Sequence, residues 1–332
     1  MKAVVVGSGA WGTALSLRLC KNGHDVILWS FDPKEAAQMR EKRENPMLPG
    51  VQLPAELQIS TDISCAAGRE LVVMASPSFA VRQVSRNVAP YLDKDAVVVS
   101  VAKGIEASTQ LRMSQIIGEE TGKTVVALTG PSHAEEVGRS LPTGCVAACA
   151  DKKLAEIVQD AFMSDVFRIY TSPDIVGAEL GGALKNVIAL CAGVTDGLGY
   201  GDNIKAMLMT RGLTEMARLG VSLGASKDTF AGLAGVGDLI VTCTSEHSRN
   251  HRAGVLIGQG YSPKEAMERV GAVVEGYYAA GAAWQLCQQQ GVEMPIVQAA
   301  YALLYEGVSA EKVLEILLNR GKKAETEDAG WQ

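Results

Sequence analysis

The sequence predicts an α/β chain in which a doubly wound, mostly parallel sheet is followed by an all-α domain. Short valine-rich apolar runs alternate with helical stretches in the first half, and a glycine-rich turn follows the first run. After about Pro173 the strand-like runs largely disappear. Strands that are apolar throughout are typical of a parallel sheet covered on both faces. We therefore expect two domains, residues 1–173 and 174–321, and a loose tail at 322–332.

The same patterns predict the individual elements. Strands are expected at Val4–Val6, Val26–Trp29, Leu71–Met74, Val97–Ser100, Thr124–Leu128 and Cys145–Ala148. Helices are expected between them, for example at Phe79–Tyr91 and Ser108–Gly118. Turn groups at the strand ends, where such sheets bind ligands, are Ser76-Pro77-Ser78, Ala102-Lys103-Gly104 and Gly130-Pro131-Ser132. The later helical patterns cover Val176–Val194, Asp202–Leu219, Pro263–Arg269, Tyr277–Gln290, Ile296–Tyr305 and Ala310–Leu318.

The turn after the first strand has the spacing of a dinucleotide-binding fingerprint. Gly7 allows a tight turn, Gly9 leaves room for a pyrophosphate, and Gly12 lets the next helix pack closely on the strand. The free N–H groups at the start of that helix would face the phosphates. The first domain is therefore expected to be of the Rossmann type and to bind NADH or NADPH.

Composition and charge exclude several classes of function. The chain has 332 residues, of which 47% are hydrophobic and 20% charged, and its net charge is −6. That charge argues against nucleic acid or an acidic membrane as a partner. We expect no apolar run long enough to span a bilayer and no signal peptide. The scattered 7 cysteines and 4 histidines show no metal-ligand spacing. We therefore expect no metal site and a reducing, cytoplasmic compartment.

Asp32 stands about 20 residues beyond the glycine turn, where the fingerprint normally has an acid. It could accept hydrogen bonds from the adenosine ribose, which would favour NADH. A 2′-phosphate would meet like charge there, about 4 kcal/mol at 4 Å and a surface-like dielectric. Lys34 and Arg40 could offset part of that repulsion. Asp32-Pro33 is equally well explained as the N-cap of a helix.

Two lysines and one arginine are candidate functional cations. Lys103 follows a strand and precedes a glycine, so it is expected to point into the crevice rather than to lie on the surface. Lys185 lies in an apolar helix, and a nearby cation there would lower its pKa from about 10.4 and suit it to acid–base work. Arg249, just before a new helix, suits a phosphate, although alone it is better explained by a surface ion pair with Glu246.

Seven motifs follow one another along the chain, and the match that they support runs from Gly7 to about Arg320. In order they are Gly-Ser-Gly-Ala-Trp-Gly-Thr-Ala, Lys-Gly-Ile-Glu, Gly-Pro-Ser-His-Ala, Leu-Lys-Asn-Val, Gly-Asp-Leu, Ser-Arg-Asn and Val-Glu-Gly-Tyr. In this order they resemble the soluble, bacterial-type NAD(P)-dependent glycerol-3-phosphate dehydrogenases. The resemblance implies reversible reduction of dihydroxyacetone phosphate, a phosphorylated triose, to sn-glycerol 3-phosphate for glycerophospholipid synthesis.

The resemblance also implies roles for single residues. Lys185 would be the proton donor and acceptor, Lys103 would lie beside substrate and cofactor, and Asp238 would order both lysines. The expected substrate contacts are Lys103, Gly130, Ser132, Lys185, Asn186, Asp238, Thr242, Ser248, Arg249 and Asn250. The expected cofactor contacts, from fingerprint and resemblance together, are Gly7, Gly9, Ala10, Trp11, Gly12, Phe31, Asp32, Phe79, Lys103, Ala134, Arg249, Val273 and Glu275.

The chain departs from the resemblance at Phe31-Asp32, where many bacterial members have a basic pair, and this favours NADH over NADPH. Another two-domain dehydrogenase, of the 6-phosphogluconate or hydroxyacyl-CoA type, is an alternative that the Ser-Arg-Asn motif after Gly-Asp-Leu argues against. A non-catalytic NADH-sensing protein is a second alternative, although such a protein would have no need for Lys103, Lys185 and Asp238. The alanine-rich helical half favours a homodimer, but a large intramolecular core would look the same.

Overall fold

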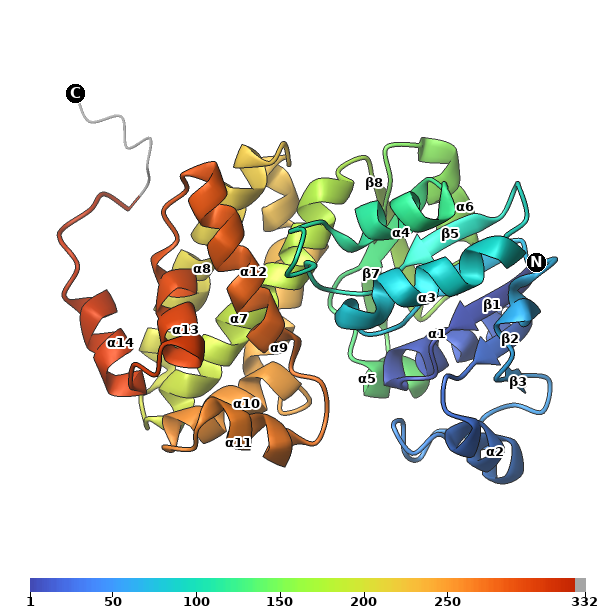
Figure 1. The fold of residues 1–332 in the computed structure, drawn as a ribbon, viewed down its shortest axis with the longest axis horizontal. Coiled ribbons are helices and arrows are strands. Elements are labelled where there is room, and N and C mark those ends of the chain that lie inside the picture. Colours follow the sequence, from blue (N-terminus) through green and yellow to red (C-terminus); the bar gives the residue numbers. More distant parts are fainter. Residues whose placement is uncertain (326–332) are drawn as a thin grey trace.

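The computed structural model describes residues 1–325 and consists of a sheet-containing half and a helical half, which lie side by side (Figure 1). The sheet has the strand order β3-β2-β1-β4-β5-β6-β7-β8, and every neighbouring pair is parallel except β6 and β7. Its strands are β1 Lys2–Val6, β2 Asp25–Trp29, β3 Gln58–Ser60, β4 Leu71–Met74, β5 Val97–Ser100, β6 Val125–Thr129, β7 Thr143–Ala148 and β8 Phe167–Ser172.

Helices cover both faces of the sheet, as its apolar strands require. Along β1, Ala3 and Val5 pack with residues of α1, α5 and α6, whereas Val4 and Val6 pack with residues of α3 and α4. β1 pairs with β2 on one side and with β4 on the other, so the strand order reverses there and opens a crevice at the carboxyl ends. The helices of this half are α1 Ala10–Lys21, α2 Pro33–Lys42, α3 Val81–Val88, α4 Met113–Thr121, α5 Ala134–Gly138 and α6 Lys152–Phe162.

The predicted fold class is confirmed, and each of the apolar runs forms a strand. Two strands were missed. β3 has only three residues, and β8 mixes buried with exposed positions, as an edge strand does, so neither shows a continuous apolar run. The helix expected at Ser108–Gly118 is wrong in its first part. Residues 106–111 form a turn in which Gln110 has a φ of 58°, and α4 begins only at Met113.

The second half is helical, and α7 (Ile175–Gly197) runs through its core. Around it lie α8 Asp202–Ser222, α9 Asp238–Thr244, α10 Arg249–Gly258, α11 Pro263–Val270, α12 Glu275–Gln290, α13 Pro295–Tyr305 and α14 Ala310–Leu318. By length and mean hydropathy (1.5) alone α7 could cross a membrane, contrary to the expectation that no run would be long enough. However, 83% of that window is buried inside the protein, as in a core helix.

The expected tail is only partly within the described residues. Lys323 Nζ lies 2.5 Å from Glu293 Oε2, and Arg211 Nη1 donates to the carbonyl oxygen of Glu325 at 3.1 Å. Residues 326–332 lie outside the described part.

Glycines allow α7 and α10 to approach backbone to backbone. A Cβ on Gly193 would lie 2.1 Å from the His251 carbonyl oxygen, and one on Gly254 would lie 2.0 Å from that of Leu190. Gly197 and Gly258, each one turn further along, meet in the same way. Because both helices present glycine at this spacing, α10 is held along the C-terminal part of α7.

We predict that Gly254→Ala destabilises the protein by about 1–3 kcal/mol or more, because the added methyl group meets backbone that cannot move aside. Thermal unfolding followed by circular dichroism measures the effect. Gly321→Ala is the matched control, because a Cβ there meets nothing within 4 Å. Equal melting temperatures for the two variants would show that the helices tolerate a wider separation.

Candidate active site

Three segments bring charged side chains together at the carboxyl end of the sheet. Lys185 Nζ, on α7, donates to Asp238 Oδ1 and, at 2.7 Å, to Thr242 Oγ1. Lys103 Nζ, from the loop after β5, donates to Asp238 Oδ2 at 2.7 Å and to the Gly130 carbonyl oxygen at 3.0 Å. A single carboxylate at the start of α9 therefore bridges both lysines.

Burial and charge set the protonation of this cluster. Lys185 is 6% exposed and Asp238 is 1% exposed. Burial lowers the pKa of Lys185 to about 8, with Asp238 opposing that shift and Lys103 adding to it. Burial alone would raise the pKa of Asp238, but the two ammonium groups hold it below its usual value. The result is an ionised carboxylate beside a lysine that can exchange its proton near neutral pH.

Glycines in α7 make this close approach possible. A Cβ on Gly182 would lie 3.0 Å from Thr129 Oγ1 and 3.4 Å from Lys103 Cγ. One on Gly181 would lie 2.2 Å from the Ala234 carbonyl oxygen, in the π-helical turn Leu233–Gly237 that precedes Asp238. These two small residues let α7 bring Lys185 beside both the sheet and α9.

The first turn of α10 is tied to α7 next to Lys185. Asn250 Nδ2 donates to Asn186 Oδ1 at 2.9 Å, and Asn250 Oδ1 accepts from the Gly276 N–H at 2.8 Å. Ser248 caps the helix by accepting from the His251 N–H at 3.2 Å. Arg249 is exposed, and no ion pair to Glu246 forms among residues 1–325. The first turn of α10, which carries Arg249, therefore lies beside the part of α7 that carries Lys185.

The glycine turn after β1 has the geometry that a dinucleotide needs. Gly7 has a φ of +130°, and a Cβ there would lie 2.6 Å from the Ala75 carbonyl oxygen. A Cβ on Gly12 would lie 2.0 Å from the Gly7 carbonyl oxygen, whereas one on Gly9 would meet nothing within 4 Å. Gly9 gives α1 no side-chain cap, so the first N–H groups at Ala10 and Trp11 remain for an anion. The residues present fit a pyrophosphate.

Asp32 caps the next helix: its Oδ1 accepts from the Lys34 N–H at 2.7 Å, so the N-cap explanation is confirmed. The second carboxylate oxygen of Asp32 can still accept a hydrogen bond from a ribose hydroxyl. Phe31 and Phe79 are exposed by 85% and 65%, unusually far for phenylalanine. Phe31 lies beside Asp32 in the chain. The ring centroid of Phe79 lies 6.2 Å from that of Tyr278, in the helical half.

Glu275 joins the two halves through Ser78, for which the sequence predicts only a place in a turn. Ser78 Oγ donates to Glu275 Oε2 at 2.5 Å, and the Ser78 N–H donates to Oε1 at 3.2 Å. Burial raises the pKa of Glu275, while Ser78 and the charge of Arg249 oppose that shift. The only local signal for this joint was the position of Ser78 at the end of a predicted strand.

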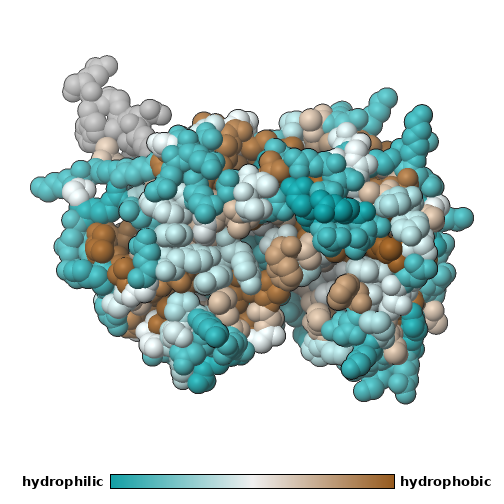
Figure 2. All heavy atoms as spheres, viewed as in Figure 1, coloured by the Kyte–Doolittle hydropathy of each residue, from teal (hydrophilic) through white to brown (hydrophobic). Residues whose placement is uncertain are grey.

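Of the remaining expected residues, Ser132 is linked to this cluster through Gly130. Ser132 Oγ donates at 2.9 Å to the Gly130 carbonyl oxygen, the same atom that accepts from Lys103. Ala134 begins α5 and is buried, and Val273 lies half-buried just before α12. Figure 2 shows a notch in the surface at its lower edge, between α10 and α11 on one side and the sheet-containing half on the other. Across residues 1–325 no group of three or more His, Cys, Asp or Glu side chains could hold a metal ion.

Comparisons with known proteins show the family to which the chain belongs. The family model described as NAD-dependent glycerol-3-phosphate dehydrogenase N-terminus matches residues 2–155, and the corresponding C-terminus model matches residues 174–315. A relative from Pelotomaculum thermopropionicum named glycerol-3-phosphate dehydrogenase [NAD(P)+] is 52% identical over 98% of this chain and 95% of its own length. A second relative of the same name, from a Thermoanaerobacter species, is 51% identical over 98% of this chain and 99% of its own length.

A solved structure shows the same arrangement. The glycerol-3-phosphate dehydrogenase of Coxiella burnetii superposes with a TM-score of 0.93 at 34% identity, covering 96% of this chain and 99% of that one. Both halves of the chain thus match one kind of enzyme in the expected order, and the resemblance inferred from seven motifs is confirmed. The chain is an NAD(P)-dependent dehydrogenase and belongs to the NAD-dependent glycerol-3-phosphate dehydrogenase family.

Proposed function

We propose that this enzyme reversibly reduces dihydroxyacetone phosphate to sn-glycerol 3-phosphate, in the cytoplasm, for glycerophospholipid synthesis. The observation that carries the proposal is a pair of lysines on the buried carboxylate of Asp238, beside a helix start that carries the exposed Arg249. A phosphorylated ketone needs an acid for its carbonyl oxygen and a cation for its phosphate. A homodimer stays a prediction, supported by the alanine-rich helical half.

An assay of nicotinamide absorbance with dihydroxyacetone phosphate tests the activity, and running it with both cofactors tests their preference. NADH is favoured. The carboxylate oxygen of Asp32 that does not cap the helix can accept a hydrogen bond from a ribose hydroxyl, whereas the charged carboxylate would repel a 2′-phosphate. No turnover with this substrate, but turnover with another phosphorylated ketone, would overturn the proposed substrate.

Hydride is supplied by the bound nicotinamide cofactor. Lys185 has three N–H donors, and Asp238 and Thr242 accept two of them. The third is available to the substrate's carbonyl oxygen, to which Lys185 gives a proton in the reduction and from which it takes one in the oxidation. Lys103 adds a second positive charge that stabilises the oxygen as negative charge develops on it.

The phosphate is assigned to the first turn of α10. Arg249 can form two charge-assisted hydrogen bonds, and the helix N-terminus adds its N–H groups. Asn250 is already tied to Asn186, the neighbour of Lys185, so the phosphate end and the carbonyl end of one small substrate can be held at the same time. Ser248 and Asn250 would complete the phosphate contacts.

We predict that Lys185→Ala lowers kcat by about two to four orders of magnitude, the usual contribution of a positioned acid–base group. The dissociation constant for NADH, measured by fluorescence, should hardly change, because Lys185 lies at the carbonyl end. Lys264→Ala, on the exposed surface of α11, is the control. Near-normal turnover in Lys185→Ala would remove this lysine from the mechanism.

Arg249→Ala should weaken binding of dihydroxyacetone phosphate by about 1.5–3 kcal/mol, the range for hydrogen bonds to charged groups. Isothermal titration of the protein with the substrate measures this directly. Arg252→Ala, an exposed arginine on the same helix, should leave the affinity unchanged. An equal affinity for both variants would contradict a phosphate site at Arg249.

The pH dependence of the reduction has a predicted sign. Lys185 must be protonated to act as the acid, so kcat/KM should fall as the pH rises through its pKa of about 8. The charged or titratable groups facing it are Asp238 on α9, Lys103 on the loop after β5, and His133 before α5.

Because Asp238 raises the pKa of Lys185, Asp238→Asn should move the fall in kcat/KM to lower pH. Asp228→Asn, an exposed acid, is the control. A move to higher pH in Asp238→Asn would assign the titration to another group.

A further inference from the structure

The loop that carries Lys103 has little regular structure of its own. Between β5 and α4, residues 101–112 contain one isolated bridge, from Ile105 to Arg112, and no helix. We call this segment the Lys103 loop. Its lysine nevertheless reaches Asp238 and Gly130 with two well-formed hydrogen bonds. Since a flexible loop would spread this lysine over many positions, other contacts must fix the backbone nearby.

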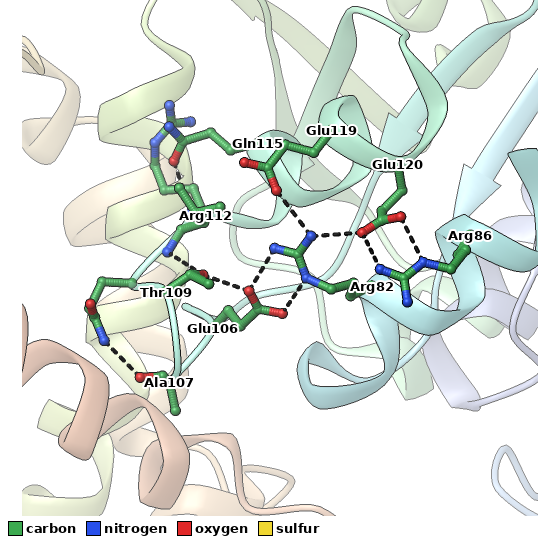
Figure 3. A network of polar contacts seen from close by, with 11 residues as sticks. Arg82, Arg86, Glu106, Ala107, Thr109, Arg112, Gln115, Glu119 and Glu120 are labelled. Atoms are coloured by element: carbon green, nitrogen blue, oxygen red, sulfur yellow. Dashed lines mark hydrogen bonds and ion pairs between the residues drawn. The ribbon is translucent and has the colours of Figure 1, made fainter.

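One such contact is made by Arg82 on α3, whose guanidinium binds Glu106 of the loop with two hydrogen bonds (Figure 3). Arg82 Nε donates to Glu106 Oε1 at 2.9 Å, and Nη2 donates to Oε2 at 2.7 Å. The remaining nitrogen, Nη1, donates to Glu119 Oε2 at 3.0 Å and to Glu120 Oε1 at 2.7 Å on α4. The guanidinium is therefore held on both sides, and bidentate pairs of this kind fix geometry as well as charge.

Glu106 passes this constraint to the loop backbone. Its N–H donates to the Leu111 carbonyl oxygen at 3.0 Å, and its own carbonyl oxygen accepts from the Gln110 N–H at 2.8 Å. Its side chain also accepts from Thr109 Oγ1 at 2.5 Å. The backbone of Glu106 thus forms the hydrogen bonds that close the turn, and its side chain attaches the turn to Arg82 on α3.

Only two residues separate Glu106 from Lys103, so the Cα atoms of these two residues lie within about 11 Å of each other. Between them, Gly104 packs against Ser78, where an added Cβ would lie 2.4 Å from the serine Cβ. Ser78 is also the residue that holds Glu275. The short stretch from Ser78 to Arg82 therefore contacts the Lys103 loop twice and Glu275 once.

We propose that Arg82 is a positioning residue for Lys103: by holding Glu106 it fixes the loop that presents Lys103 to the substrate. The proposal rests on the proposed role of Lys103. Arg82 pairs with three carboxylates, and without its positive charge Glu106, Glu119 and Glu120 repel one another more strongly and push the loop away from α4. Arg82 itself contacts no residue assigned to substrate or cofactor.

Arg86 provides a matched control. It lies one turn further along α3 and forms a fork with Glu120, but it makes no contact with the Lys103 loop. Arg82→Gln should lower kcat about 10-fold or more, the scale expected for a misplaced catalytic group. Arg86→Gln should stay within about twofold of the parent enzyme, as surface substitutions generally do. Arg82→Lys keeps the charge but not the fork, so its kcat should fall between the two.

The decisive experiment is a double-mutant cycle with Lys103→Ala, with kcat taken per folded site. If Arg82 acts through Lys103, Arg82→Gln should have little further effect once Lys103 is alanine, because no lysine is left to position. Losses that multiply would mean a general structural role and would overturn the proposal. Should Arg82→Gln fail to fold, Glu106→Gln, which removes the fork's partner charge, takes its place in the same cycle.

The single variants separate this proposal from the one on which it rests. A Lys103→Ala enzyme with normal kcat would overturn both the role of Lys103 and the positioning role of Arg82. A Lys103→Ala enzyme with strongly reduced kcat beside a normal Arg82→Gln enzyme would overturn only the positioning role. The expected result is a reduced kcat in both single variants, with a double variant whose kcat is little lower than that of Lys103→Ala alone.

Discussion

The buried carboxylate of Asp238 is the constraint on which the site depends. Two ammonium groups lie within hydrogen-bonding distance of it in a place that water hardly reaches. Without that charge, burial and mutual repulsion would drive a proton off one of the lysines. Breaking a buried pair by removing one partner typically costs about 3–5 kcal/mol. The cluster keeps one net positive charge, which suits an oxygen that becomes negative during the reaction.

That charge cluster could not form without very close backbone contacts. Gly181 and Gly182 bring α7 against the turn before Asp238 and against the stem of Lys103, and glycines at 193, 197, 254 and 258 bring α10 against α7. The small residues of the second half therefore serve the site as well as the core. They set the separation at which a lysine, a carboxylate and a helix N-terminus from three helices can act on one small molecule.

Much of this could be predicted from the sequence, because it depends on local patterns. Val4–Val6 followed by the glycine turn predicts the first strand and the phosphate site, and a lysine at 185 stands out in an apolar helix. The contacts of Ser78 with Glu275 and of Arg112 with Glu179 join residues 197 and 67 positions apart, for which no local pattern exists. The glycine spacing in α7 and α10 was visible, but its meaning depends on which helices become neighbours.

The Lys103 loop belongs to the contact between the two halves as much as to the sheet. Arg112, at its end, and Ser114, in the first turn of α4, bind the buried Glu179 of α7, and Gln110 of the loop binds Gln285 of α12 at 2.9 Å. Lys103 therefore comes from the sheet-containing half, whereas Lys185 and Asp238 come from the helical half. Because one carboxylate must hold both lysines, the site is complete only while the two halves stay together. A change in their separation would alter the position of Lys103 first, and with it the charge felt by Lys185.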